Sequence, residues 1–226
     1  MNTILAILIA LGLGLILGLI NGFLITKGKL APFIVTLATM TIFRGLTLVY
    51  TDGRPIAGPK DNFAFQFLGK GQFLGIPFQV ILFALAFLIL WTILNKTALG
   101  RKIYAVGGNE KASFISGINI DKVKINVYVI SSLMAVLSGL VLTSRLNSAQ
   151  PTAGVAYEMD AIAAVVLGGT SMAGGSGSLT GTLIGILILG VLNNGLNLLG
   201  VSSFYQQIVK GIVILIAVLI DRKRNK

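Results

Sequence analysis

Long apolar runs alternate with short polar connections along the whole chain. A helix needs about 20 apolar residues to span the hydrocarbon layer of a bilayer, so each run of that length is predicted to be a transmembrane helix. These predicted spans cover residues 3–26, 31–50, 73–94, 125–143, 178–199 and 204–220. A run at 159–168 is too short to cross as a straight helix, and it leads into a glycine-rich stretch at 168–177. The pattern predicts an all-α, polytopic transmembrane helix bundle of about six full spans with one short broken or re-entrant helix shielded by protein.

The first run has the features of a packed membrane helix rather than of a signal peptide. It lacks a preceding basic region and is longer than the apolar region of a signal peptide. Gly14, Gly18 and Gly22 recur at intervals of four and therefore share one helix face, a spacing that lets two helices approach closely. Arg44 interrupts the second run, and it either faces the protein interior or extends to an interface.

Composition supports the membrane assignment and excludes several kinds of chemistry. Hydrophobic residues make up 55% of the 226 residues and charged residues 11%, with a mean hydropathy of +0.91. Soluble domains carry about 25% charged residues, so too few polar side chains remain to coat a water-facing surface. The chain has no Cys and no His, which removes thiol chemistry, disulfides and His-based catalysis, and we expect neither a metal site nor a cofactor.

The positive charge indicates membrane orientation. A net charge of +11 would suggest nucleic acid in a soluble protein, but here the basic residues lie between apolar runs, as they do on the cytoplasmic side of membrane proteins. The segment 95–124 holds six Lys and Arg against two acidic residues and is predicted to be cytoplasmic, as is the basic tail at 221–226. Counting spans backward from this segment places Met1 outside, where a protein without a signal sequence seldom starts. An odd number of missing N-terminal spans would resolve that conflict.

Within the basic segment, residues 97–123 form a loop whose local structure can be predicted. Gly107 and Gly108 are predicted to make a sharp turn, because a positive φ costs glycine little. Asn109 can cap a following short helix at 110–116, and Gly117 can end it. Such a helix needs packing against a surface. The residues alone leave open whether that surface is the membrane or a partner protein.

Several polar residues near the spans are candidates for a translocation path. Asn193 and Asn197 share a helix face and either line a path or form interhelix hydrogen bonds. Gln150, in the polar segment 144–157, is a third path candidate. Lys210 is expected to extend to the outer interface. The acidic pair at the start of the short run, Glu158 and Asp160, either caps that helix or contacts a docked protein.

Four motifs carry a family resemblance that runs nearly end to end. They occupy residues 100–118, 148–154, 160–171 and 192–203. Together they resemble bacterial ABC-importer permeases of the ribose, arabinose and xylose type, and most of all the ribose-transporting members. The N-terminal spans and the Gly-Ile-Asp-Leu-Ser-Val-Gly type motif of that family are missing, which agrees with the count of spans. The resemblance therefore implies one transmembrane permease domain at 1–226, the C-terminal portion of a longer family fold.

The resemblance also implies a role for the 97–123 loop and a set of partners. The loop would be the cytoplasmic coupling loop that docks on a separate ATP-binding subunit, which binds the ATP. Its coupling residues would be Tyr104, Gly107, Gly108, Asn109, Ala112, Ser116, Gly117 and Ile118. Further implied partners are a periplasmic or surface sugar-binding protein, a second permease copy in a homodimer, and the sugar itself. The implied location is the bacterial cytoplasmic (inner) membrane, with a cytoplasmic C-terminus.

Other functions remain as alternatives. A non-functional, truncated remnant of such a permease would also explain the missing spans. An ion-coupled secondary transporter would need acidic residues within the spans, and only Asp160 is near one. A membrane enzyme would need a cluster of His, Cys or carboxylates, and the sequence has none. The glycine-rich stretch lacks the Lys of a phosphate-binding P-loop, so the chain is not expected to hydrolyse ATP. Nothing in the sequence fixes which sugar is carried.

Overall fold

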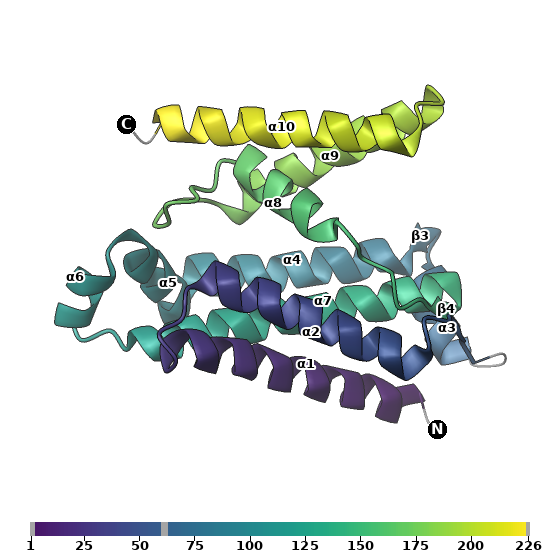
Figure 1. The fold of residues 1–226 in the computed structure, drawn as a ribbon, viewed down its shortest axis with the longest axis horizontal. Coiled ribbons are helices and arrows are strands. Elements are labelled where there is room, and N and C mark those ends of the chain that lie inside the picture. The colour runs from purple at the N-terminus through teal and green to yellow at the C-terminus, as the bar shows by residue number, and fades with distance from the viewer. Residues whose placement is uncertain (1–2, 60–62, 225–226) are drawn as a thin grey trace. The chain divides into compact units, whose positions relative to one another are not determined.

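The computed structural model describes residues 3–59 and 63–224, and the described residues are mainly helical (Figure 1). Within them the long helices are α1 (Thr3–Thr26), α2 (Pro32–Thr51), α4 (Phe78–Lys96), α7 (Ile120–Leu146), α9 (Leu179–Leu198) and α10 (Ser203–Arg224). All of these except α10 are long and apolar enough to cross a bilayer; the apolar part of α10, Ser203–Leu219, is shorter. The predicted polytopic, all-α membrane fold is confirmed.

Shorter elements connect the long helices. The short helices are α3 (Phe63–Lys70), α5 (Ala98–Gly108), α6 (Glu110–Ile115) and α8 (Tyr157–Leu167). The strands are β1 (Ile56–Ala57), β2 (Gln72–Phe73), β3 (Ile76–Pro77) and β4 (Ser148–Ala149). They form two antiparallel pairs, β1 with β4 and β2 with β3. The short α8 and the irregular backbone after it agree with the predicted short helix and glycine-rich break.

The start of the third span was predicted too early. The prediction placed it at residue 73, whereas α4 begins at Phe78. Leu74 and Gly75 have φ values of 52° and 79° and close a two-residue turn between β2 and β3. Apolar residues at 73–77 therefore belong to a hairpin, and hydrophobicity alone does not separate such a hairpin from a helix. The polar connection at 51–72 also contains α3, which was not predicted.

The fourth span is longer than predicted because two Asn residues set its ends. The prediction was 125–143, while α7 runs over 27 residues. The Asn119 side chain accepts a hydrogen bond from the Lys122 backbone N–H at 3.0 Å, which caps the N-terminus of α7. Asn147 ends α7 in the left-handed conformation with φ 50°. Polar residues in the first turn thus belong to the helix although they lie outside its apolar run.

The chain divides into two units, and the first contains residues 1–89 and 119–153. In this unit α1 packs along α7 through the predicted glycine face (Figure 1). A Cβ added to Gly18 would lie 2.7 Å from the Val129 Cα, and one added to Gly22 would lie 2.9 Å from the Ile125 Cα. Only glycine permits this backbone approach, so the prediction of a small-residue packing face is confirmed.

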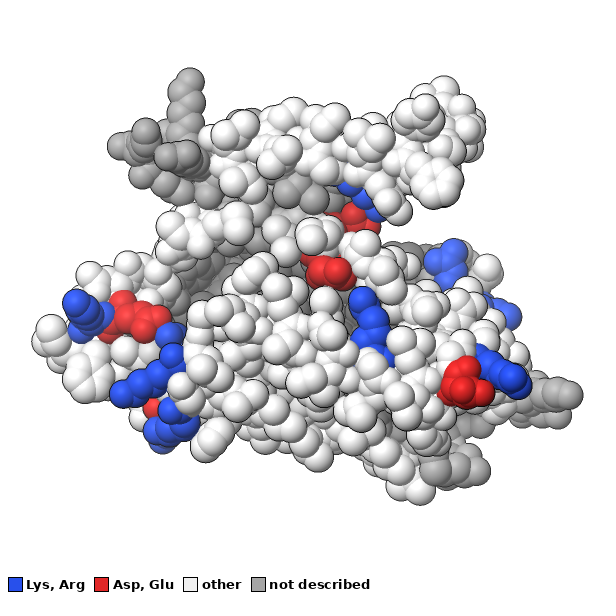
Figure 2. Space-filling view, viewed as in Figure 1, with Lys and Arg blue, Asp and Glu red and all other residues white. Residues whose placement is uncertain are grey.

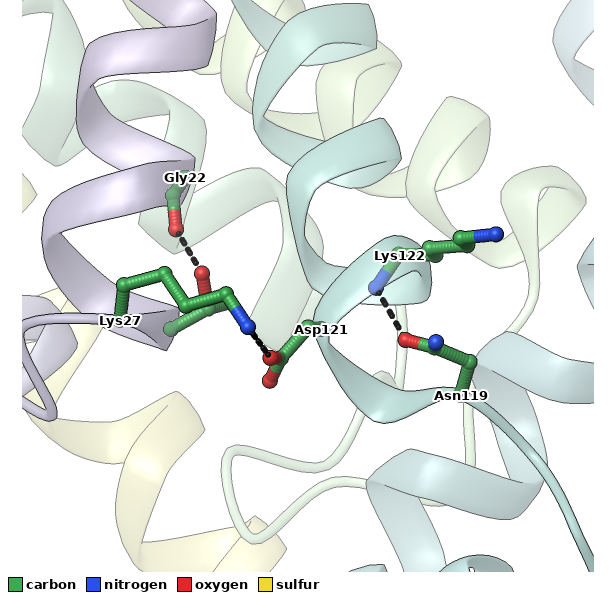
Figure 3. Close-up of polar contacts among 6 residues, drawn as sticks. Gly22, Lys27, Asn119, Asp121 and Lys122 are labelled. Atoms are coloured by element: carbon green, nitrogen blue, oxygen red, sulfur yellow. Dashed lines mark hydrogen bonds and ion pairs between the residues drawn. The ribbon is translucent and has the colours of Figure 1, made fainter.

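An ion pair joins α1 and α7 at one end of their contact. The Lys27 Nζ, just beyond α1, lies 2.9 Å from an Asp121 carboxylate oxygen in the first turn of α7 (Figure 3). Both side chains are well exposed, at 59% and 40%. The helix α1 itself has no charged residue, and the side of it that faces the viewer in Figure 2 is uncharged. The pair therefore marks the polar end of an apolar helix pair.

The second unit contains residues 90–118 and 154–226. Its core is formed by Ala163 and Ala164 of α8 and Leu189 of α9, with Val213 of α10 packed against them. Two glycines let α9 approach α8 at backbone distance, because a Cβ on Gly181 or Gly185 would collide with backbone atoms of α8 or of Gly168. Met1 and the last two residues of the predicted basic tail, Asn225 and Lys226, lie outside the described residues.

Candidate coupling segment

The predicted coupling loop is folded as two consecutive helices, α5 and α6, in the second unit. Thr97 caps α5, its side chain accepting a hydrogen bond from the Gly100 backbone N–H at 3.4 Å. The chain then leaves α5 at Asn109, whose φ of −156° and ψ of 104° are extended. The direction change predicted at Gly107 and Gly108 is therefore wrong: both glycines are helical, and Asn109 breaks the helix instead.

Asn109 has the capping role that the sequence predicts. Its side-chain oxygen accepts a hydrogen bond from the Ala112 backbone N–H at 3.0 Å, and Glu110 follows in the first turn of α6. An acidic residue there is favoured by the positive end of the helix dipole. A short helix is thus started by one side chain with defined geometry.

The other end of α6 is closed by a Schellman motif. Gly117 has φ 79°, and the Ile118 backbone N–H donates to the Ser113 carbonyl oxygen at 3.0 Å. The Ser116 hydroxyl donates to the Ala112 carbonyl oxygen at 2.9 Å. The predicted helix end at Gly117 is confirmed. With both ends fixed, α6 is a short helix of defined length rather than a loose loop.

The outer surface of α6 is partly apolar. Phe114 is 72% exposed and Ile115 is 85% exposed, and within α6 only Ser113 is buried. Acidic and basic side chains lie together over α6 (at the left of Figure 2). Two large apolar side chains held out by a capped helix, with charges around them, are typical of a surface that packs against a protein or a membrane. Neither residue was predicted as a site residue, although the apolar pair between polar neighbours was a signal in the sequence.

In the structure, the other predicted coupling residues fall into two groups. Ala112 on α6 and Ser116 at its C-cap are exposed, close in the chain to the apolar pair. Tyr104 instead faces inward: its hydroxyl donates a hydrogen bond to the Gly177 carbonyl oxygen at 2.8 Å. Gly107 lies one turn further along α5 and contacts the same glycine-rich stretch. The predicted coupling residues therefore include exposed residues at α6 and residues of α5 that contact the glycine-rich stretch.

The three path candidates are divided between the two units. Gln150 is exposed and lies in the first unit, whereas Asn193 and Asn197 lie on α9 in the second. The Asn197 side-chain oxygen accepts a hydrogen bond from the Gln206 amide at 2.8 Å, which joins the end of α9 to α10. The Asn193 side-chain oxygen is buried with no hydrogen-bond partner among the described residues. Asn197 thus has the interhelix role, and Asn193 keeps an unused acceptor.

Lys210, which was expected to extend to the outer interface, forms an ion pair within the second unit. Its ammonium group lies 2.8 Å from an Asp160 carboxylate oxygen, with the two side chains 28% and 33% exposed. Ala156 stands at the N-cap position of α8, and no side chain makes a capping hydrogen bond there, so neither Asp160 nor Glu158 caps the helix. Both acidic residues do lie in the first turn, where the helix dipole favours them. Within the described residues, no group of three or more His, Cys, Asp or Glu side chains could hold a metal ion.

Comparison with known proteins defines the class. Residues 1–218 match the family described as the branched-chain amino acid transport system / permease component, and the chain belongs to this family of membrane permeases. Its helices and their apolar character are those of a polytopic integral membrane protein. No solved structure matches the chain.

Individual relatives are sugar permeases. The chain is 67% identical over 205 residues to the ribose import permease protein RbsC of Bacillus subtilis, a match that covers 91% of this chain and 64% of the relative. It is 54% identical over 226 residues to RbsC of Escherichia coli K12, covering 99% of this chain and 70% of the relative. It is 41% identical over 207 residues to the L-arabinose transport system permease protein AraH of the same strain, covering 92% and 62%. The chain thus spans about two thirds of the length of these curated relatives.

Proposed function

We propose that the chain is the membrane-spanning permease subunit of an ATP-driven bacterial sugar importer, with ribose as its substrate. The high identity to proteins named as ribose import permeases supports this choice over other sugars, since the match to the arabinose permease is weaker. The permease forms the translocation path in the cytoplasmic membrane, and a sugar-binding protein delivers ribose to it. A second copy of the permease completes the path.

The observation that carries the proposal is the capped helix α6 with its exposed apolar pair, Phe114 and Ile115. A permease without a nucleotide-binding motif needs a rigid surface on which a separate ATP-binding subunit acts. Asn109 and Gly117 fix the two ends of α6, and Phe114 and Ile115 offer apolar surface to the partner. The six basic residues of 95–124 support a cytoplasmic position for α6, and the basic tail supports one for the C-terminus.

The mechanism that follows is alternating access. ATP binding closes the pair of ATP-binding subunits, and their movement shifts α6 relative to the membrane. The permease then changes between states open to the outside and to the cytoplasm. Ribose is neutral and rich in hydroxyl groups, so amides such as Asn193, with its unused acceptor, suit the path better than fixed charges.

An ion-coupled transporter fits the structure less well. Such a protein needs an acidic side chain in its spans that can take up a proton or Na⁺. Asp160, the candidate that the sequence offered, is paired with Lys210 at 2.8 Å. A carboxylate already engaged in an ion pair is not free to bind a transported ion.

The test is uptake of radiolabelled ribose into proteoliposomes that contain the permease with its ATP-binding and sugar-binding subunits. We expect uptake to require ATP on the side of the membrane where the ATP-binding subunit lies. Uptake should persist when proton and Na⁺ gradients are collapsed. Radiolabelled arabinose serves as the control sugar and is expected to enter more slowly. Uptake that follows an ion gradient and ignores ATP would contradict the proposal.

A further inference from the structure

The end of α5 lies against the glycine-rich stretch at backbone distance. A Cβ added to Gly175 would lie 2.7 Å from the Gly108 Cα, and one added to Gly107 would lie 2.8 Å from the Gly175 backbone nitrogen. A Cβ on Gly174 would collide with the Gly107 carbonyl oxygen. Real side chains do not tolerate such distances, so Gly107, Gly174 and Gly175 are what allows the two segments to touch. The contact lies entirely within the second unit.

A side-chain hydrogen bond fixes the same contact. The Tyr104 hydroxyl donates to the Gly177 carbonyl oxygen at 2.8 Å, and Tyr104 lies one helical turn before Gly107. Tyr104 is half-buried, which shields this bond from water. We call the contact of Tyr104, Gly107 and Gly108 with residues 174–177 the glycine clasp.

The glycine-rich stretch is internally braced rather than loose. The Ser171 backbone N–H donates to the Ser176 carbonyl oxygen at 3.0 Å, and the Gly174 N–H donates to the Ser171 carbonyl oxygen at 3.2 Å. Gly174 and Gly175 have φ values of 92° and 74°, which L side chains rarely adopt. Both the conformation and the contact therefore require glycine here. A stretch with its own hydrogen bonds passes on a displacement that a loose loop would absorb.

Both ends of this stretch enter packed helices. It follows α8 and precedes α9, whose backbones approach at Gly168, Gly181 and Gly185. The opposite end of α8 is tied to α10 through the Asp160–Lys210 ion pair. A displacement of the clasp therefore reaches three helices of the second unit through packed contacts, with no unbraced segment between them.

We propose that the glycine clasp is the link that carries movement of the coupling segment into α8 and α9. Tyr104 and Gly175 are positioning residues for coupling: they do not touch the ATP-binding subunit, but they convert its push on α6 into movement of the membrane helices. This inference rests on the proposed function, since it assigns the route by which ATP hydrolysis drives the path.

The experiment compares Gly175→Ala with Gly200→Ala in the assembled importer. Gly200 also has a positive φ, 70°, but a Cβ there meets open space, so it matches the backbone strain of Gly175 without the close approach. Three quantities are measured: retention of the ATP-binding subunit on purification, the rate of ATP hydrolysis, and ribose taken up per ATP hydrolysed. A milder pair, Tyr104→Phe with Tyr205→Phe as control, removes one hydroxyl each and avoids backbone strain.

We expect both importers with a changed clasp to keep the ATP-binding subunit and to hydrolyse ATP. Their ribose uptake per ATP should fall, by about two- to thirtyfold for Gly175→Ala, the range typical of residues that modulate coupling. The loss for Tyr104→Phe should be about fivefold, as expected for one hydrogen bond. The two control variants should match the unchanged importer. Because a merely structural defect lowers hydrolysis and uptake together, the ratio isolates coupling.

Two results would overturn the clasp as the link: an unchanged ratio in Tyr104→Phe and Gly175→Ala, or loss of the ATP-binding subunit from both, which would make the clasp part of the docking surface. Failure of the proposed function looks different. In that case the unchanged importer itself shows no ATP-driven ribose uptake, whatever the variants do.

Discussion

Asp160 in α8 and Lys210 in α10 form an ion pair whose charged atoms lie 2.8 Å apart. Both side chains are about two-thirds buried, in helices that pack on each other within the second unit. Charged groups within apolar helices are expensive alone and are therefore paired. The pair fixes α10 to the end of α8 that lies away from the glycine clasp.

Removing one partner of this pair should destabilise the protein. Asp160→Asn leaves the largely buried Lys210 charge without its counter-ion, and we expect a loss of roughly 1 to 3 kcal/mol, between the values for exposed and for fully buried pairs. Thermal unfolding of the purified chain in detergent measures the loss. The double variant Asp160→Lys/Lys210→Asp restores opposite charges and should recover most of it. If the double variant is no more stable than Asp160→Asn, the attraction between the two opposite charges does not stabilise the protein.

The ion pair between Lys27 and Asp121 should contribute far less. Its side chains are exposed, and exposed pairs contribute about 0 to 1 kcal/mol. Lys27→Gln is therefore expected to change the unfolding temperature only slightly, and added salt should remove even that difference by screening. Lys29→Gln, at a neighbouring basic residue, is the control. A loss of stability as large as that of Asp160→Asn would contradict the argument that the exposed pair contributes less than the largely buried one.

Contact between α1 and α7 should depend on glycine at Gly18. Its replacement by Leu puts a side chain where the Val129 backbone lies, and overpacking of this kind costs about 1 to 3 kcal/mol or more. Gly12→Leu is a control on the same helix, because a Cβ there meets nothing within 4 Å. Resistance of both variants to unfolding by denaturing detergent is the measurement. Equal losses in the two variants would mean that helix propensity or expression, rather than the close approach, determines the result.

The cap of α6 should control the local stability of that helix. Asn109→Ala removes the acceptor for the Ala112 N–H, a change that costs about 1 kcal/mol. Hydrogen exchange of the α6 amides should accelerate, while exchange in α7 stays unchanged. Asn109→Ser keeps an acceptor and should behave as the unchanged protein does. Unaltered exchange in Asn109→Ala would show that contacts other than the cap hold α6.

Hydrophobicity predicted the membrane helices well, because a span must be both long and apolar. It failed where short-range hydrogen bonding decides, as in the β2–β3 hairpin that precedes Phe78 and at the Asn119 cap that extends α7. Asn109 and Gly117 could be predicted as the ends of α6, since cap residues act within a few positions of the chain. For Gly107 and Gly108 the prediction was wrong in conformation, because glycine permits a turn but does not require one.

The long-range contacts of the candidate site could not be predicted from the sequence. Tyr104 bonds a residue 73 positions away, and Lys210 pairs with one 50 positions away. Spacing along one chain carries no information on which distant segments meet. The glycines of the clasp can be seen individually in the sequence, but their contact depends on two distant segments that lie together. The prediction that residues 97–123 dock on an ATP-binding subunit stays a prediction.

The most direct test of that claim is binding of the ATP-binding subunit to a permease with a changed α6 tip. Phe114→Asp places a charge on a side chain that is 72% exposed, so the fold should be unaffected. If α6 is the docking helix, the dissociation constant should rise at least about tenfold, as expected for truncating a central apolar anchor of an interface. Phe63→Asp, at a Phe that is 79% exposed on α3, is the matched control and should bind normally. Normal binding by Phe114→Asp would contradict the assignment of α6 as the coupling helix.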